Sequence, residues 1–91
     1  MFTRLAPQKV KHSDGFVVQI ANRHSAEYIE SSRRATISVE FGAWVCVYEN
    51  TLSAWSSDAG GSSMSATDRE RVARRIVAGL EAMGGRPVKL C

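Results

Sequence analysis

The sequence predicts an α+β fold in which an antiparallel sheet of about five to six short strands packs against one C-terminal amphipathic helix. Three observations lead to this prediction: apolar and polar residues alternate over 35–41, a helix-start signal stands at 67–70, and a stretch rich in Gly and Ser separates the two. A chain of 91 residues, 44% of them hydrophobic, has the size of one domain. We expect a single domain over 1–91, with mainly strands in 1–49, a turn and Gly/Ser loop in 50–66, the helix in 67–83 and a short strand in 86–90.

The first half of the chain has the pattern of strands. Residues 16–20 and 26–30 are rich in β-branched and aromatic side chains. The clearest strand covers 35–41, where apolar residues alternate with polar ones at period two. Such alternation indicates a sheet with one buried face.

The strand over 35–41 is followed by Gly42-Ala43, which predicts a hairpin with a two-residue loop. That register places three facing pairs on one core face: Phe41 with Trp44, Val39 with Cys46, and Ile37 with Tyr48. The alternative is an unbroken strand over 36–48, with Trp44, Cys46, Tyr48 and Glu40 on the face opposite Ile37. We favour the hairpin because a small core needs the area of these aromatic side chains.

The second half of the chain predicts a helix. Thr67-Asp68-Arg69-Glu70 has the form of a capping box, and Gly84-Gly85 ends the helical pattern. Between them one stripe gathers the apolar residues Val72, Ala73, Ile76, Val77, Leu80 and Met83. Gly79 beside this stripe suggests a close approach to the sheet, and 88–90 after Pro87 fits a last edge strand.

The two cysteines, Cys46 in a strand and Cys91 at the last position, do not resemble a disulfide framework. We therefore expect a protein with reduced thiols in the cytoplasm. The sequence has no apolar run of signal-peptide or membrane-spanning length, so we expect no membrane partner.

No group of residues predicts catalysis. His12 and His24 lack metal-ligand spacing, Cys46 fits a buried strand position better than a nucleophile, and the sequence contains no phosphate-binding or dinucleotide motif. We expect neither an enzyme nor a cofactor, metal site or small-molecule substrate.

Four arginines in the helix pattern raise a second possibility, a small nucleic-acid-binding module. Arg69, Arg71, Arg74 and Arg75 could form a positive stripe in a chain whose net charge is +3. A solvated helix face explains them better, because Glu70 and Arg74 have the spacing of a favourable ion pair. Nucleic acid is therefore the alternative partner.

Trp55 also has two interpretations. Leu52 and Trp55 have the spacing of one helical turn, which would hold both side chains against the edge of the core. Trp is also over-represented at binding interfaces, so Trp55 could be an interface anchor.

The run Val45-Cys46-Val47-Tyr48-Glu49-Asn50-Thr51-Leu52-Ser53-Ala54-Trp55, followed by a loop and a helix pattern from Asp68-Arg69-Glu70 to Gly84-Gly85, resembles the immunity protein 74 family of bacterial polymorphic-toxin systems. Ser56-Ser57-Asp58 stand where that family has a proline-bearing acidic segment. The resemblance implies a β-rich domain with one helix and a final strand. It also implies an immunity protein that binds and neutralises a cognate toxin domain, as in contact-dependent growth inhibition.

If that toxin is a nuclease, its cationic cleft would attract carboxylates. The toxin-binding candidates are Glu27, Glu30, Glu49 and Asp58, with Trp55 as the apolar anchor.

Overall fold

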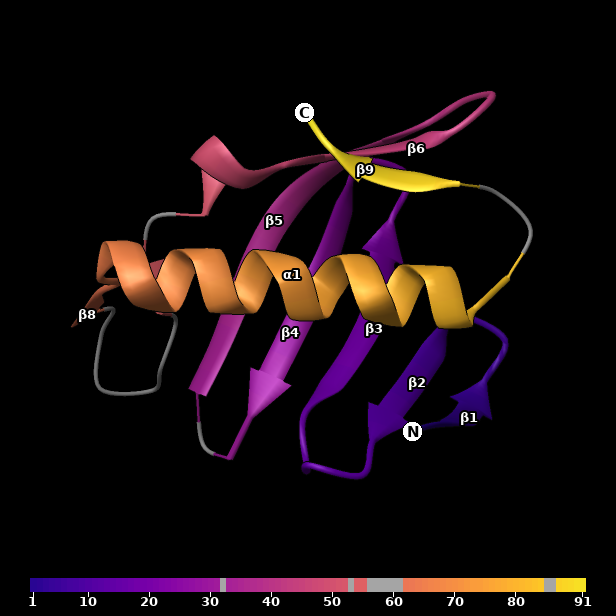
Figure 1. Cartoon of the computed structure of the whole chain (residues 1–91), viewed down its shortest axis with the longest axis horizontal. Helices are drawn as coiled ribbons and strands as arrows, with labels where there is room; N and C mark the ends of the chain where they lie inside the picture. Colours follow the sequence, from indigo (N-terminus) through magenta and orange to yellow (C-terminus); the bar gives the residue numbers. More distant parts are fainter. Residues whose placement is uncertain (32, 53, 56–61, 85–86) are drawn as a thin grey trace.

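The computed structural model describes residues 1–31, 33–52, 54–55, 62–84 and 87–91. A mixed seven-stranded sheet carries one helix, α1, across one of its faces (Figure 1). The sheet has the order β1-β2-β3-β4-β5-β6-β9, with β1 Phe2–Ala6, β2 Lys9–His12, β3 Val17–Asn22, β4 Ser25–Glu30, β5 Arg33–Phe41, β6 Val45–Tyr48 and β9 Val88–Leu90. The predicted α+β class is confirmed, with more strands than expected.

The first six strands follow one another as an antiparallel meander, and the last strand departs from the prediction. β9 pairs parallel to β6, with Val45 opposite Val88 and Val47 opposite Leu90. A parallel pair needs a long connection that returns the chain to the same end of the sheet, and here that connection contains α1. The sheet is therefore mixed rather than purely antiparallel.

Helix α1 spans Ala66–Ala82 and starts one residue before the predicted range. Its N-cap is Ser65, whose hydroxyl accepts a hydrogen bond from the Asp68 amide, so Thr67 does not hold the cap position. The predicted apolar stripe is confirmed, because Val72, Ala73, Ile76 and Leu80 are buried and Val77 and Met83 pack, partly buried, against the core.

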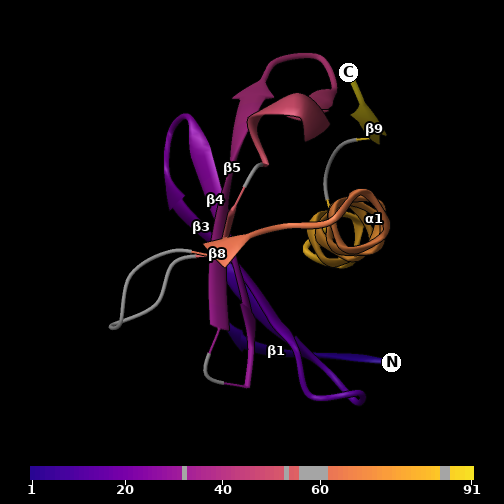
Figure 2. The same ribbon diagram turned by 90° about the vertical axis from the view of Figure 1, so that its left-hand side faces the viewer.

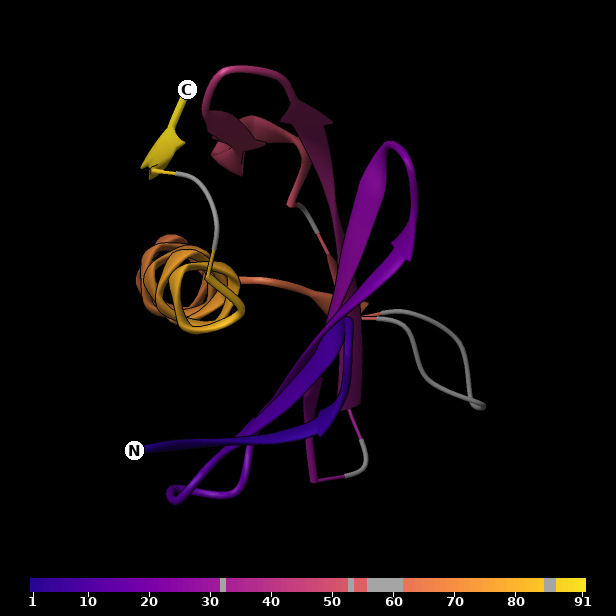
Figure 3. The ribbon, with the colours of Figure 1, turned by 90° about the vertical axis from the view of Figure 1, so that its right-hand side faces the viewer.

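Gly79 permits the close helix-to-sheet contact that its position suggested. A Cβ on this residue would lie 2.7 Å from the Cβ of Val18 in β3. Seen along the sheet, α1 forms a separate layer on one side of the strongly twisted strands (Figures 2 and 3). The core lies between these two layers, around Val18, Tyr28, Ile37 and Ile76.

The hairpin between β5 and β6 exists, but its predicted register is wrong. Phe41 pairs with Val45 and Val39 with Val47, so the loop has three residues, Gly42 to Trp44. Val45 and Val47 are consequently buried, while Trp44 is 46% exposed. The extra loop residue reverses the face of every side chain that follows it, because side chains alternate along a strand.

The segment after β6 also differs from the prediction. A 3₁₀ turn, η1, covers Glu49–Thr51, and Trp55 belongs to a short strand, β7 Ala54–Trp55, instead of a helical turn with Leu52. β7 pairs with β8, Ser62–Ser63, at the end of the predicted Gly/Ser loop. Residues 56–61 of that loop lie outside the described residues.

The expectation of reduced, unpaired cysteines is contradicted. Cys46 of β6 and Cys91 form a disulfide, with their Cα atoms 5.5 Å apart. The parallel pairing of β9 beside β6 brings the two residues together, and sequence spacing gave no sign of that pairing. Within the described ranges, no helix has the length and apolar character needed to cross a membrane.

Candidate functional site

The five residues expected to bind a partner do not form one site. Glu27 and Glu30 are on opposite faces of β4, because Glu27 alternates with the buried Tyr28 whereas Glu30 shares its side. Glu49 lies in η1 and Asp58 lies outside the described residues. Trp55 is only 2% exposed, so as folded here its ring offers a partner almost no surface.

Glu30 is the centre of a polar network at the N-terminal half of α1. Its Oε1 accepts hydrogen bonds from the Tyr28 hydroxyl at 2.7 Å and from Arg71 Nη1 at 2.8 Å, and Arg75 Nη1 lies 3.4 Å away. Arg33 binds the other oxygen of the carboxylate. We call Tyr28, Glu30, Arg33, Arg71 and Arg75 the Glu30 network.

The network keeps Glu30 ionised. Burial by itself would raise the pKa of Glu30, but hydrogen bonds from Tyr28, Arg33 and Arg71 and the charge of Arg71 outweigh it and lower that pKa below its ordinary value. Burial and the hydrogen bond to Glu30 raise the pKa of Tyr28. Tyr28 therefore stays a neutral donor beside a charged acceptor.

Two network arginines also cover aromatic rings. The guanidinium carbon of Arg33 lies 4.2 Å from the centre of the Trp55 ring, and that of Arg75 lies 4.6 Å from the centre of the Phe16 ring. These contacts are cation–π interactions within the fold. Arg33 and Arg75 thus cover aromatic rings of the core while they also bind the Glu30 carboxylate at its edge.

The interpretation of the helix arginines as a solvated face holds only in part. Arg74 forms an exposed ion pair with Glu70 at 2.7 Å, with side-chain exposures of 72% and 58%. Arg71 and Arg75 instead reach across to β4. Sequence reasoning missed this role, because the partner carboxylate lies 41 residues from Arg71 in the chain.

A second group of side chains lies on the sheet face opposite α1, over β5, β6 and β9. Trp44 donates its indole N–H to the Cys46 sulfur at 3.2 Å, and the Lys89 ammonium lies 4.0 Å from the centre of the Trp44 ring. Beside them the Tyr48 hydroxyl donates to Glu40 Oε2 at 3.2 Å. We call Glu40, Trp44, Cys46, Tyr48 and Lys89 the outer strip.

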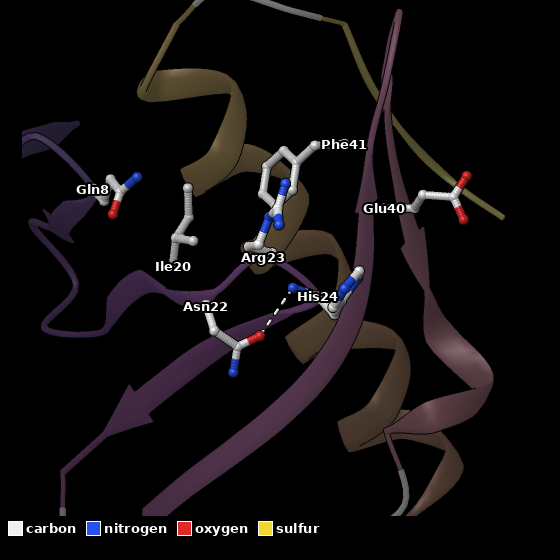
Figure 4. Close-up of a pocket in the computed structure, with 7 residues that line it drawn as sticks. All are labelled: Gln8, Ile20, Asn22, Arg23, His24, Glu40 and Phe41. Carbon is white, nitrogen blue, oxygen red and sulfur yellow. Dashed lines mark hydrogen bonds between the residues drawn. The ribbon is translucent and has the colours of Figure 1, made fainter.

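A third feature is a groove at the end of the molecule where β3 turns into β4. It has a volume of about 670 Å³. Figure 4 shows Ile20 between Gln8 and Phe41, which ends β5, and Glu40 directed away from the others. Asn22, Arg23 and His24 complete its lining.

One of the two strand registers considered from the sequence predicted most of the outer strip, but it was not the register that we favoured. The unbroken-strand alternative already placed Trp44, Cys46 and Tyr48 with Glu40 on the face opposite Ile37, and that face is the one observed. The groove had no comparable signal, because its lining comes from three separate turns and strand ends.

Within the described residues, no three His, Cys, Asp or Glu side chains are grouped so that they could hold a metal ion. Comparisons with family models, with curated proteins and with solved structures find no match to this chain.

Proposed function

We propose that this chain is a non-catalytic binding protein that neutralises the toxic domain of a bacterial effector by forming a stoichiometric complex with it. The observation that carries the proposal is Trp44, which is 46% exposed and yet held by defined contacts. Tryptophan and tyrosine are enriched among the residues that dominate binding energy at interfaces. The outer strip contains both.

The contacts of Trp44 favour binding because they lower the conformational entropy that its side chain loses when a partner binds. Lys89 covers one side of the ring, and Cys46, whose sulfur accepts the indole hydrogen bond, is held in β6 by strand pairing with β5 on one side and β9 on the other. A side chain already held in place loses less conformational entropy when a partner covers it. An exposed but fixed tryptophan is thus suited to a preformed interface.

The resemblance to immunity proteins supplies the class of partner, a toxin domain, with a nuclease as the type considered first. The carboxylates available to a cationic cleft then differ from those first expected. Glu30 is bound by arginines and Glu27 faces Arg34 at 3.6 Å, whereas Glu40 stands in the outer strip itself. We therefore add Glu40 to Glu49 and Asp58 as contact candidates.

We place this activity in the cytoplasm, where an immunity protein meets a toxin that has entered. Because that compartment keeps thiols reduced, Cys46 and Cys91 would be thiols there and would join under oxidising conditions. Mass measurement of the protein after rapid alkylation of intact cells distinguishes the two states. A disulfide found in living cells would contradict the cytoplasmic assignment.

Co-expression with the neighbouring open reading frame of the source genome tests the function. We expect rescue of growth and a one-to-one complex that survives about 150 mM salt, conditions that screen exposed charges beyond about 8 Å. Replacing Trp44 with Ala should weaken the complex by at least about tenfold. The matched control is Leu5→Ala, an exposed apolar residue on β1, which should bind like the parent.

The absence of both rescue and complex would contradict the proposal and direct attention to nucleic acid. Three of the four helix arginines that suggested this alternative, Arg71, Arg74 and Arg75, have carboxylate partners within the chain, and Arg69 forms no ion pair in the described residues. Binding to DNA or RNA that falls steeply with salt, by about 0.9 log unit per log unit of salt for each phosphate contacted, would establish it.

A further inference from the structure

The groove beside the β3–β4 turn exists because α1 is too narrow to cover the whole core side of the sheet. A helix with its side chains is about 10–12 Å across, whereas a nine-residue strand such as β5 runs about 30 Å. Alternation along the strands puts Ile20 on the side of the buried Val18, and Phe41 on the side of the buried Val39. Both side chains thus continue the core surface beyond the helix.

The rim of the groove is polar and is held in a defined shape. The side chain of Asn22 accepts a hydrogen bond from the His24 amide at 2.9 Å, which fixes the turn that carries Arg23. The carbonyl of His24 in turn accepts a hydrogen bond from the Val39 amide at 2.9 Å. Arg23 therefore stands on a turn tied to the neighbouring strand.

The charge at this rim is unbalanced. In the described part of the chain no carboxylate forms an ion pair with Arg23, unlike Arg33, Arg71, Arg74 and Arg75. The acidic residue nearest in the lining, Glu40, points away from the groove and binds Tyr48 (Figure 4). The groove thus combines an apolar floor with a cationic, hydrogen-bonding edge.

We infer that this groove receives an apolar side chain of a partner protein that is flanked by a carboxylate, with the apolar group on Ile20 and Phe41 and the carboxylate on Arg23. The volume of about 670 Å³ lies within the range of about 300–1,000 Å³ typical of binding pockets. The inference rests on the proposed function for the identity of the partner, an acidic segment of the toxin domain. The chemistry of the groove itself can be tested without that partner.

The first test uses three peptides with blocked ends, Glu-Trp-Glu, Lys-Trp-Lys and Glu-Ala-Glu, titrated into the ¹⁵N-labelled protein. We expect only the first to shift the amide signals of 20–24 and 41, with a dissociation constant on the order of 1 mM. Arg23→Gln should weaken it about threefold, as for an exposed ion pair. Arg34→Gln, an exposed arginine at the start of β5, is the matched control and should leave it unchanged.

Equal binding of the Lys-Trp-Lys and Glu-Trp-Glu peptides, or shifts confined to the outer strip, would overturn the inference.

The toxin complex supplies the second test. Phe41→Ala and Arg23→Gln should each weaken the complex while the free variants keep the parent far-UV spectrum. A complex that forms with the parent and is unaffected by both variants refutes the groove but leaves the proposed function standing. If no complex forms at all, the proposed function fails and the peptide titration alone decides the groove.

Discussion

The Glu30 network and the groove lie at different places along the helix-facing side of the sheet, and they use arginine in opposite ways. In the network, three guanidinium groups converge on one carboxylate and two of them cover aromatic rings of the fold. In the groove, Arg23 stands beside apolar side chains with no carboxylate bound to it in the described part of the chain. The comparison teaches that a high density of arginine in the sequence can serve ion pairs within the fold, as in the Glu30 network. What matters is whether the charge already has a partner within the fold.

The two tryptophans should differ in the same way, Trp55 supporting the fold and Trp44 not, and Trp55→Ala should give the largest loss of stability. Trp55→Ala removes a 2% exposed ring from beneath Arg33, so we expect the free energy of unfolding to fall by about 3–5 kcal/mol. Trp44→Ala should cost less than about 0.5 kcal/mol, because the ring is half exposed. Urea denaturation followed by circular dichroism measures both. Similar losses for the two variants would remove the distinction between a structural and a binding tryptophan.

The disulfide should have the next largest effect. It closes a loop with a sequence separation of 45 residues, and losing it should cost about 2–4 kcal/mol because the unfolded chain is no longer restrained. The variant with Ser at both Cys46 and Cys91 should therefore melt below the oxidised parent. The parent treated with dithiothreitol should melt at the same temperature as the variant. Identical melting of the oxidised parent and the variant would show that β9 is held by its strand pairing alone.

Glu30→Gln tests whether the network is structural, and we expect a loss of about 1–3 kcal/mol near neutral pH. The isosteric amide leaves three arginines without their carboxylate in a partly buried place.

The pH dependence of stability provides the control for Glu30→Gln. Because the pKa of Glu30 is lowered in the folded state, the unfolded chain takes up the proton first as the pH falls. The parent should therefore lose its advantage over the variant between about pH 5 and the folded pKa. A difference that stays constant with pH would mean that the charge of Glu30 contributes nothing.

Arg74→Gln should change the free energy of unfolding least, by no more than about 0.5 kcal/mol. The reason is that both side chains of its ion pair with Glu70 are exposed to solvent. The variant separates this surface pair from the neighbouring Arg71 and Arg75, which the sequence alone did not distinguish from it. Thermal unfolding at low and high salt measures the difference. A loss as large as that of Glu30→Gln would extend the network along the helix.

The sequence by itself determined the fold class, the helix and its buried stripe, the strand pattern of 35–41 and the close approach at Gly79. These features depend on periodicity and on the preferences of neighbouring residues, which act over a few positions. The hairpin register lay beyond that reach, since a loop of two or three residues at Gly42 fits the same alternation but reverses the face of Trp44. Only the tertiary structure decided that face, the parallel pairing of β9 with β6 that brings Cys46 next to Cys91, and which arginines bind Glu30. All of these depend on contacts between residues far apart in the chain, and such contacts form only when the whole core packs.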